Sequence, residues 1–193
     1  MKKTLLLLTL LIGVVFSTYA QFDNGSSPKI GGGFSFGAAF GANSSAYPAA
    51  GGVHLKFEFP VSDSPLSLIF NVGYTFFVSG DGYQYNSDGY GDDYSNGSIL
   101  SFVPVEVGAK YYIFNRVFAE GDVGASFSLS STDENGNSIS KVSPIFSPNV
   151  GYTIPFGSTR ASLDLSLGAD VSPQSGGGYN QVCLKATFNF GLN

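Results

Sequence analysis

Apolar and polar residues alternate with a period of two along residues 103–129. The odd positions are apolar, and the even positions carry small or charged residues such as Gly108 and Lys110. A polar break at 114–116 interrupts the pattern, which then resumes on odd numbers as far as Leu129. A period of two is typical of a β-strand with one apolar and one polar face, and a three-residue break between two such strands predicts an antiparallel hairpin.

The same alternation recurs along the rest of the chain, so the pattern predicts eight strands. An even number of antiparallel strands lets the first pair with the last, and every backbone group within a membrane then has a partner. The fold class expected is therefore all-β, an eight-stranded antiparallel up-and-down transmembrane β-barrel. The predicted strands are 29–40, 51–61, 66–78, 103–113, 117–129, 142–154, 160–171 and 179–192.

The length of the strands and their polar face favour a membrane barrel. Each arm of the hairpin is longer than the usual strand of about five or six residues and reaches the roughly 9–11 that a tilted strand needs to cross a bilayer. The polar face is rich in Gly, Ser and Ala, whereas a surface in contact with water is usually crowded with Lys and Glu. Small residues with a few charges of both signs suit the inside of a narrow barrel. A soluble sandwich or lipocalin-like barrel with its apolar face inward is the alternative.

The segment 142–154 fits the pattern least well, because Pro144 and Pro148 lie within it. Proline cannot donate to a strand ladder, and a closed barrel has no free edge for it. Either this strand is bulged near the two prolines, or its pairing begins only at Asn149.

The connections alternate between long and short. The long polar ones are 43–50, 79–98, 130–141 and 172–178, and the short ones are 62–65, 114–116 and 155–159. Long loops on one side and short turns on the other are the outer-membrane arrangement. We therefore expect the long loops to be extracellular and both termini to be periplasmic.

The N-terminus has the features of an export signal. Lys2 and Lys3 precede an apolar run at 4–16, and the small residues Thr18 and Ala20 fit a cleavage site. The run is too short to span a membrane. The predicted organisation is a signal peptide at 1–20, a short N-terminal segment at 21–28 and an outer-membrane barrel domain at 29–193.

Composition excludes several classes of function. Removing Lys2 and Lys3 from the nine basic residues leaves seven against fourteen acidic ones, which argues against nucleic-acid binding. Charged residues make up only 12% of the chain, as expected for a surface that faces lipid. A single cysteine, Cys183, excludes an internal disulfide. The chain has no familiar metal, phosphate-loop or hydrolase motif, and no cofactor is expected.

The export signal, the eight alternating strands, the Gly-rich first strand and the hairpin VPVEVGAKYYIFNRVFAEGDVGASF resemble the bacterial outer-membrane β-barrel family. The resemblance is to its small OmpA/OmpX-type members, often described as porin-family or outer-membrane β-barrel domain proteins. It covers the whole mature chain and implies a monomer that contacts outer-membrane lipid and the outer-membrane insertion machinery.

The alternation along the strands places a set of charged residues on the inner face of the barrel. Buried charges must pair or meet water, so a salt-bridged plug is the first interpretation and a narrow gated pore for small solutes is the second. These residues are His54, Lys56, Glu58, Glu106, Lys110, Glu120, Asp122, Arg160, Asp164, Asp170 and Lys185.

Two further kinds of chemistry remain possible. A lipid-modifying outer-membrane enzyme would need a nucleophile beside a base, and His54 is the one imidazole in the chain. Because a lone interior histidine is more often a member of a hydrogen-bond network, the chain is not expected to be an enzyme. The loop 79–98 combines tyrosines with clustered carboxylates that could bind Ca²⁺ or a surface ligand. Those carboxylates are Asp81, Asp88, Asp92 and Asp93.

The hairpin also predicts a register. If 114–116 is a three-residue loop, Ile113 faces Val117 and directly opposed residues have numbers that add to 230. Lys110 then lies opposite Glu120 on the inner face, one diagonal step from Asp122, and we expect an ion pair. Because Gly108 faces inward, we also expect Gly108→Ser to be clearly milder than Val107→Arg, which puts a charge on the lipid face. The function that best fits the whole pattern is an outer-membrane barrel with a filled interior and a structural or surface-interaction role.

Overall fold

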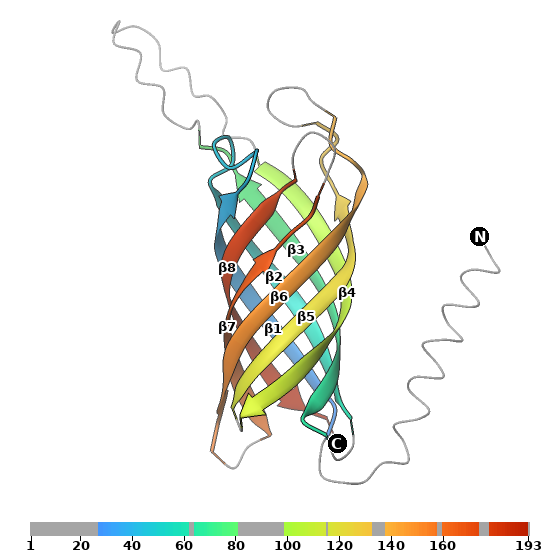
Figure 1. The fold of residues 1–193 in the computed structure, drawn as a ribbon, viewed down its shortest axis with the longest axis vertical. Coiled ribbons are helices and arrows are strands. Elements are labelled where there is room, and N and C mark those ends of the chain that lie inside the picture. The colour runs from blue at the N-terminus through green and yellow to red at the C-terminus, as the bar shows by residue number, and fades with distance from the viewer. Residues whose placement is uncertain are drawn as a thin grey trace, which may run out of the picture.

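The chain forms a closed barrel of eight antiparallel strands (Figure 1). The computed structural model describes residues 27–61, 64–80, 99–114, 116–132, 138–157, 160–173 and 178–192. None of these residues belongs to a helix long and apolar enough to cross a membrane. In chain order the strands are β1 (Lys29–Phe40), β2 (Ala49–Pro60), β3 (Leu66–Val78), β4 (Ile99–Phe114), β5 (Val117–Ser128), β6 (Val142–Pro155), β7 (Ala161–Asp170) and β8 (Asn180–Gly191).

The barrel closes because each strand pairs with its chain neighbours and β1 pairs with β8 along their full length. Lys29 faces Gly191 and Phe40 faces Asn180, so the first strand begins where the last one ends. The short connections lie at this end of the barrel, and we call it the turn end. The longer connections lie at the opposite end, which we call the loop end (Figure 1).

The alternation of the sequence has become an outer and an inner face. Large apolar side chains such as Val107 and Leu184 are 56% and 65% exposed on the outside. Polar and charged side chains such as Lys110, Asp122 and Ser147 are fully buried inside. A soluble barrel would show the reverse, so the alternative with an inward apolar face is wrong. Exposed apolar bands of this kind are stable only against lipid.

The hairpin register is as predicted except at the turn itself. Val103 faces Phe127, Val107 faces Val123 and Lys110 faces Glu120. A bulge between Tyr112 and Phe114 then shifts the pairing, so Phe114 and not Ile113 lies opposite Val117. The prediction of a three-residue loop is therefore wrong at this point. The strand continues through Phe114 and leaves a tighter connection, which the bulge accommodates by adding one residue to β4.

The two prolines of β6 cause an interruption on one side of the strand only. β6 pairs with β5 without a register shift from Val142 to Tyr152. Its continuous ladder to β7 begins at Asn149, so the alternative in which pairing begins only at Asn149 holds on the β7 side and is wrong on the β5 side. Beyond that point, Phe146 pairs with Val171 as an isolated bridge. The prolines therefore leave the β5 ladder intact and affect the β7 ladder.

Candidate functional site in the barrel interior

A buried cation organises the interior near the turn end. Lys110 Nζ lies 2.6 Å from Asp164 Oδ2 on β7 and 3.0 Å from Glu58 Oε2 on β2. All three side chains are at most 2% exposed. Ser67 Oγ donates to Glu58, and Thr153 Oγ1 donates to Asp164, so each carboxylate has a further donor. Pairing combined with hydrogen bonding is what makes buried charges tolerable.

Two aromatic rings close the interior around this cation. Lys110 Nζ lies 4.2 Å from the ring centre of Phe118 and 4.9 Å from that of Tyr112. The two rings pack edge to face, with their centres 6.0 Å apart. Lys29, at the start of β1, adds a second ion pair to Glu58 at 3.2 Å. Cation–π contacts and ion pairs together fill the turn end with side chains.

The expected ion pair between Lys110 and Glu120 does not form, although the two residues are directly opposed. Glu120 instead accepts from Lys56 Nζ at 2.8 Å, and Lys56 comes from β2. The prediction considered only adjacent strands. In a closed barrel a lysine is long enough to cross the lumen, so Lys110 is bound by carboxylates from β2 and β7. Asp122 is fully buried, and neither carboxylate oxygen has a hydrogen-bond partner among the described residues.

A second set of polar contacts lies further toward the loop end. Lys185 Nζ pairs with Asp170 Oδ1 at 2.8 Å, and Gln181 Nε2 donates to Asp170 Oδ2 at 2.7 Å. Ser147 Oγ donates to Glu106 at 2.6 Å. One of these contacts joins β4 to β6 and the others join β7 to β8, so this level is also occupied by side chains.

His54 is half-buried in the barrel interior and contacts β8 across β1. Its Nε2 lies 2.7 Å from Thr187 Oγ1 on β8. The ring lies over Gly33 of β1, where a Cβ atom would come within 2.6 Å of Nε2. A base that activates a nucleophile needs that group within reach and a substrate position beside it. His54 is packed against the barrel wall, which suits a role in the network.

Several interior glycines make room for polar side chains from the neighbouring strand. A Cβ atom on Gly108 would overlap Asp122 Oδ1 and the carbonyl oxygen of Gly121. Gly31 and Gly168 are covered in the same way by the amide groups of Asn189 and Asn149. The inner face is therefore closely packed, and Gly108→Ser has to displace Asp122 or the backbone of β5. That it is milder than Val107→Arg stays a prediction.

An apolar cluster closes the loop end, and the sequence reasoning did not identify it. It consists of Tyr47, Ala50, Phe77, Leu100, Phe102, Ile139 and Tyr179, all at most 8% exposed. The rings of Phe102 and Tyr179 have centres 5.3 Å apart. Phe77, Leu100 and Phe102 occupy inward positions, which carry mostly polar residues in the rest of the barrel. Apolar residues at these positions were the signal in the sequence that indicated the cluster. We call this group the aromatic cap.

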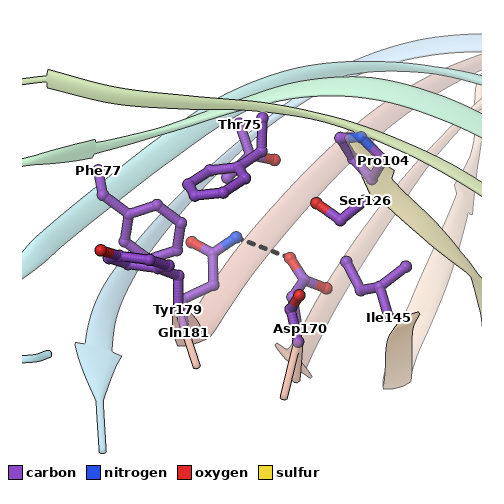
Figure 2. A pocket seen from close by; sticks show the side chains of 10 residues that line it. Thr75, Phe77, Pro104, Ser126, Ile145, Asp170, Tyr179 and Gln181 are labelled. Carbon is purple, nitrogen blue, oxygen red and sulfur yellow. Dashed lines mark hydrogen bonds between the residues drawn. The ribbon is translucent and has the colours of Figure 1, made fainter. Parts of the chain in front are cut away.

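A small cavity of about 20 Å³ lies between the aromatic cap and Asp170 (Figure 2). Phe77, Phe102 and Tyr179 of the aromatic cap belong to its lining. The hydrogen bond between Gln181 and Asp170 runs through the middle of the close view (Figure 2). A space of this size holds about one water molecule. The described part of the interior thus has two polar layers and an aromatic cap, with this small cavity below the cap.

Arg160 differs from its expected position. It is exposed in the connection that precedes β7, because that strand begins at Ala161 rather than at Arg160. The other ten predicted interior residues lie on strands, buried or half-buried. The acidic loop residues Asp81, Asp88, Asp92 and Asp93 lie outside the described residues. Within the described part of the chain, no group of three or more His, Cys, Asp or Glu side chains could hold a metal ion.

Similar proteins were found by structure and not by sequence. No family model and no curated protein sequence matches the chain. Ail, the attachment invasion locus protein of Yersinia pestis, solved with the heparin analogue sucrose octasulfate, is similar over 85% of this chain and 98% of its own, with 14% identity and a TM-score of 0.50. Neisserial surface protein A is similar over 88% of this chain and 100% of its own, with 15% identity and a TM-score of 0.57. At such identities the likeness concerns the fold, and this chain has the closed eight-stranded antiparallel fold of small outer-membrane β-barrels.

Proposed function

We propose that this protein is an integral outer-membrane barrel whose interior is a structural plug and whose loop end interacts with partners at the cell surface. The observation that carries the proposal is the combination of an exposed apolar outer face with buried ion pairs inside. The outer face binds lipid, and the ion pairs fix the strands relative to one another. In this proposal the protein is a non-enzymatic monomer that the outer-membrane insertion machinery assembles after cleavage of residues 1–20.

The plug is distinguished from a pore by its conductance. Lys56 with Glu120, and Lys110 with Glu58 and Asp164, cross the lumen at different places, and the aromatic cap covers the loop end. Ions would have to break these pairs in order to pass. We expect single-channel recordings in planar bilayers to show no conductance steps for the wild-type protein.

A matched pair of variants makes this experiment specific. Leu100→Ala with Phe102→Ala removes part of the aromatic cap, whereas Leu184→Ala with Phe188→Ala removes the same apolar groups from the outer face. Neither pair is expected to produce a channel, because the ion pairs below the cap remain. Regular conductance steps from the wild-type protein would overturn the plug and favour the narrow porin-like channel.

The surface ligand that we propose differs in charge from the one seen with Ail. That protein was solved with a sulfated polyanion. In this chain the connection 79–98 carries four aspartates, and Lys141 is the basic residue beside a loop-end connection. Like charges repel, so we propose that the loop end takes a cationic surface group or Ca²⁺. Calorimetric titration with CaCl₂ and with sucrose octasulfate tests this, and binding of the sulfated sugar alone would contradict it.

A further inference from the structure

The seam between β6 and β7 is interrupted in its loop-end half. We use the name β6–β7 seam for residues 142–148 facing residues 169–173. The continuous ladder ends at the pair Asn149 and Gly168. Beyond it, within the described residues, the two backbone bonds between Phe146 and Val171, each of 2.9 Å, and a side-chain hydrogen bond of 2.8 Å between Ser143 Oγ and Ser172 Oγ join the two segments. Over the same part of β6, the ladder to β5 is continuous.

Three prolines account for the interruption. Phe146 donates its N–H to Val171, and alternate residues of an antiparallel strand face the same neighbour, so the backbone nitrogens of Pro144 and Pro148 also face β7. Continuing the register of the ladder places Pro173 opposite Pro144. Proline has no N–H to donate, so these positions weaken the seam. The prolines are thus concentrated on the side of β6 where the wall is least bonded.

The cavity reaches this seam on one of its sides. Ile145 of β6, Asp170 of β7 and Ser172 belong to its lining, together with residues of β3, β4, β5 and β8. Ile145 and Asp170 lie beside each other in the close view (Figure 2). The aromatic cap covers the cavity toward the loop end, and the Lys185 and Asp170 ion pair lies on the opposite side. The seam is therefore a weakly bonded route from the outer face to the cavity. Its outer side is apolar, since Val142 and Phe146 are about half exposed there.

Gln181 provides a polar group for a ligand inside the cavity. It is 0% exposed, and its Nε2 donates to Asp170. Its Oε1 is buried without a hydrogen-bond partner among the described residues. A buried acceptor without a donor is unfavourable, so the site is best completed by an O–H or N–H group. Asp170 is already paired with Lys185, so its charge needs no counter-charge from a ligand.

We propose that the β6–β7 seam is a lateral entrance, through which a neutral apolar molecule bearing a hydroxyl group passes from the membrane into the cavity and donates to Gln181 Oε1. The cavity of about 20 Å³ holds only about one water in the closed form, so entry requires the Phe146 and Val171 pair to separate. Only molecules dissolved in the lipid reach the apolar outer side of the seam. The proposal goes beyond the surface role, which does not depend on it.

The experiment uses a diazirine derivative of 1-decanol with the full-length protein in phospholipid vesicles. After irradiation, labelled residues are mapped by mass spectrometry. Labelling of Phe146 and Leu184 on the outer face measures how much probe is in the bilayer. We expect additional labelling of the interior residues Ile145 and Phe102, and competition by unlabelled decanol about fivefold better than by decane, which lacks the donor.

A disulfide across the seam tests the route. In a Cys183→Ala background, Ser143→Cys with Ser172→Cys locks β6 to β7, because the two serine Oγ atoms lie 2.8 Å apart. The control is Ser126→Cys with Ser143→Cys, which joins directly opposed residues of the intact β5–β6 ladder. We expect oxidation to abolish interior labelling in the first variant, with reduction restoring it, and to leave the control labelled.

Each other outcome overturns the proposal. Absence of interior labelling while the outer face is labelled means that the cavity holds water only. Interior labelling that persists in the locked variant means that the probe enters elsewhere. Equal competition by decane and decanol, or no loss of the preference in Gln181→Met, removes Gln181 as the binding group. Folding of every variant is checked by its resistance to unfolding in SDS before heating.

Discussion

The buried charge of Lys110 is stabilised by carboxylates on β2 and β7 and not by Glu120, the residue directly opposite it. Replacing it by methionine leaves Glu58 and Asp164 buried without their main counter-charge. We therefore expect Lys110→Met to lower the free energy of unfolding by about 3–5 kcal/mol. Adding Asp164→Asn removes one of the uncompensated charges while keeping an acceptor for Thr153, and should recover part of this loss.

The partner is identified by a double-mutant cycle measured by urea unfolding in vesicles. We expect strong coupling of Lys110 with Asp164. Glu120→Leu should give no recovery in the Lys110→Met background, because it leaves Lys56 without its carboxylate. Coupling of Lys110 with Glu120 instead of Asp164 would contradict the network described above.

Two glycines of the same hairpin differ in the space around them. A Cβ atom on Gly108 would overlap the carbonyl oxygen of Gly121 and the side chain of Asp122, whereas one on Gly121 meets nothing within 4 Å. Gly108→Ala should therefore cost about 1–3 kcal/mol of folding stability, as overpacked substitutions do. Gly121→Ala, on the outer face, should be near neutral or slightly stabilising. The same urea titrations measure both, and equal effects would contradict the inward orientation of Gly108.

The loop-end half of the β6–β7 seam should open more readily than the continuous β7–β8 seam. The N–H of Phe146 donates to Val171, and the N–H of Val171 donates to Phe146. This pair is an isolated bridge, without ladder pairs directly beside it. We expect them to exchange with solvent about tenfold faster or more than amides of the continuous β7–β8 ladder. Pro148→Ala restores a donor toward Ala169 and should slow exchange at Phe146. Nuclear magnetic resonance in nanodiscs measures these rates, and uniform protection around the barrel would contradict the prediction.

The strands and their register followed from the sequence because a period of two is strictly tied to the two faces of a strand. The numbers of opposed residues add to 230 from Phe102 to Tyr112, as the short hairpin predicted. The partners of the interior charges did not follow, because a lysine reaches across the lumen to strands distant in sequence. The β6–β7 seam was suggested by Pro144 and Pro148, but its extent also depends on Pro173, which lies beyond β7.

Across the whole molecule, basic and acidic residues are distributed unevenly between the two ends of the barrel. Arg116 and Arg160 lie in turn-end connections, whereas the aspartates of 79–98 belong to a loop-end connection. The loop end also has the longer connections, and the apolar outer face lies between the two ends. In outer-membrane barrels long loops face outward and short turns face the periplasm. We therefore predict that residues 79–98 are exposed on the cell surface and that Asn115 lies in the periplasm.

Single-cysteine labelling on cells tests this orientation. Ser87→Cys and Asn115→Cys are each made in the wild-type chain, whose own Cys183 is 1% exposed and serves as an internal unlabelled site. A membrane-impermeant maleimide should label Ser87→Cys on intact cells. Asn115→Cys should react only after the outer membrane is permeabilised, because the barrel and its lipid separate the turn end from the medium. Labelling of Asn115→Cys alone on intact cells would mean that the barrel is inserted with its turns outward, and the surface role proposed for residues 79–98 would then be wrong.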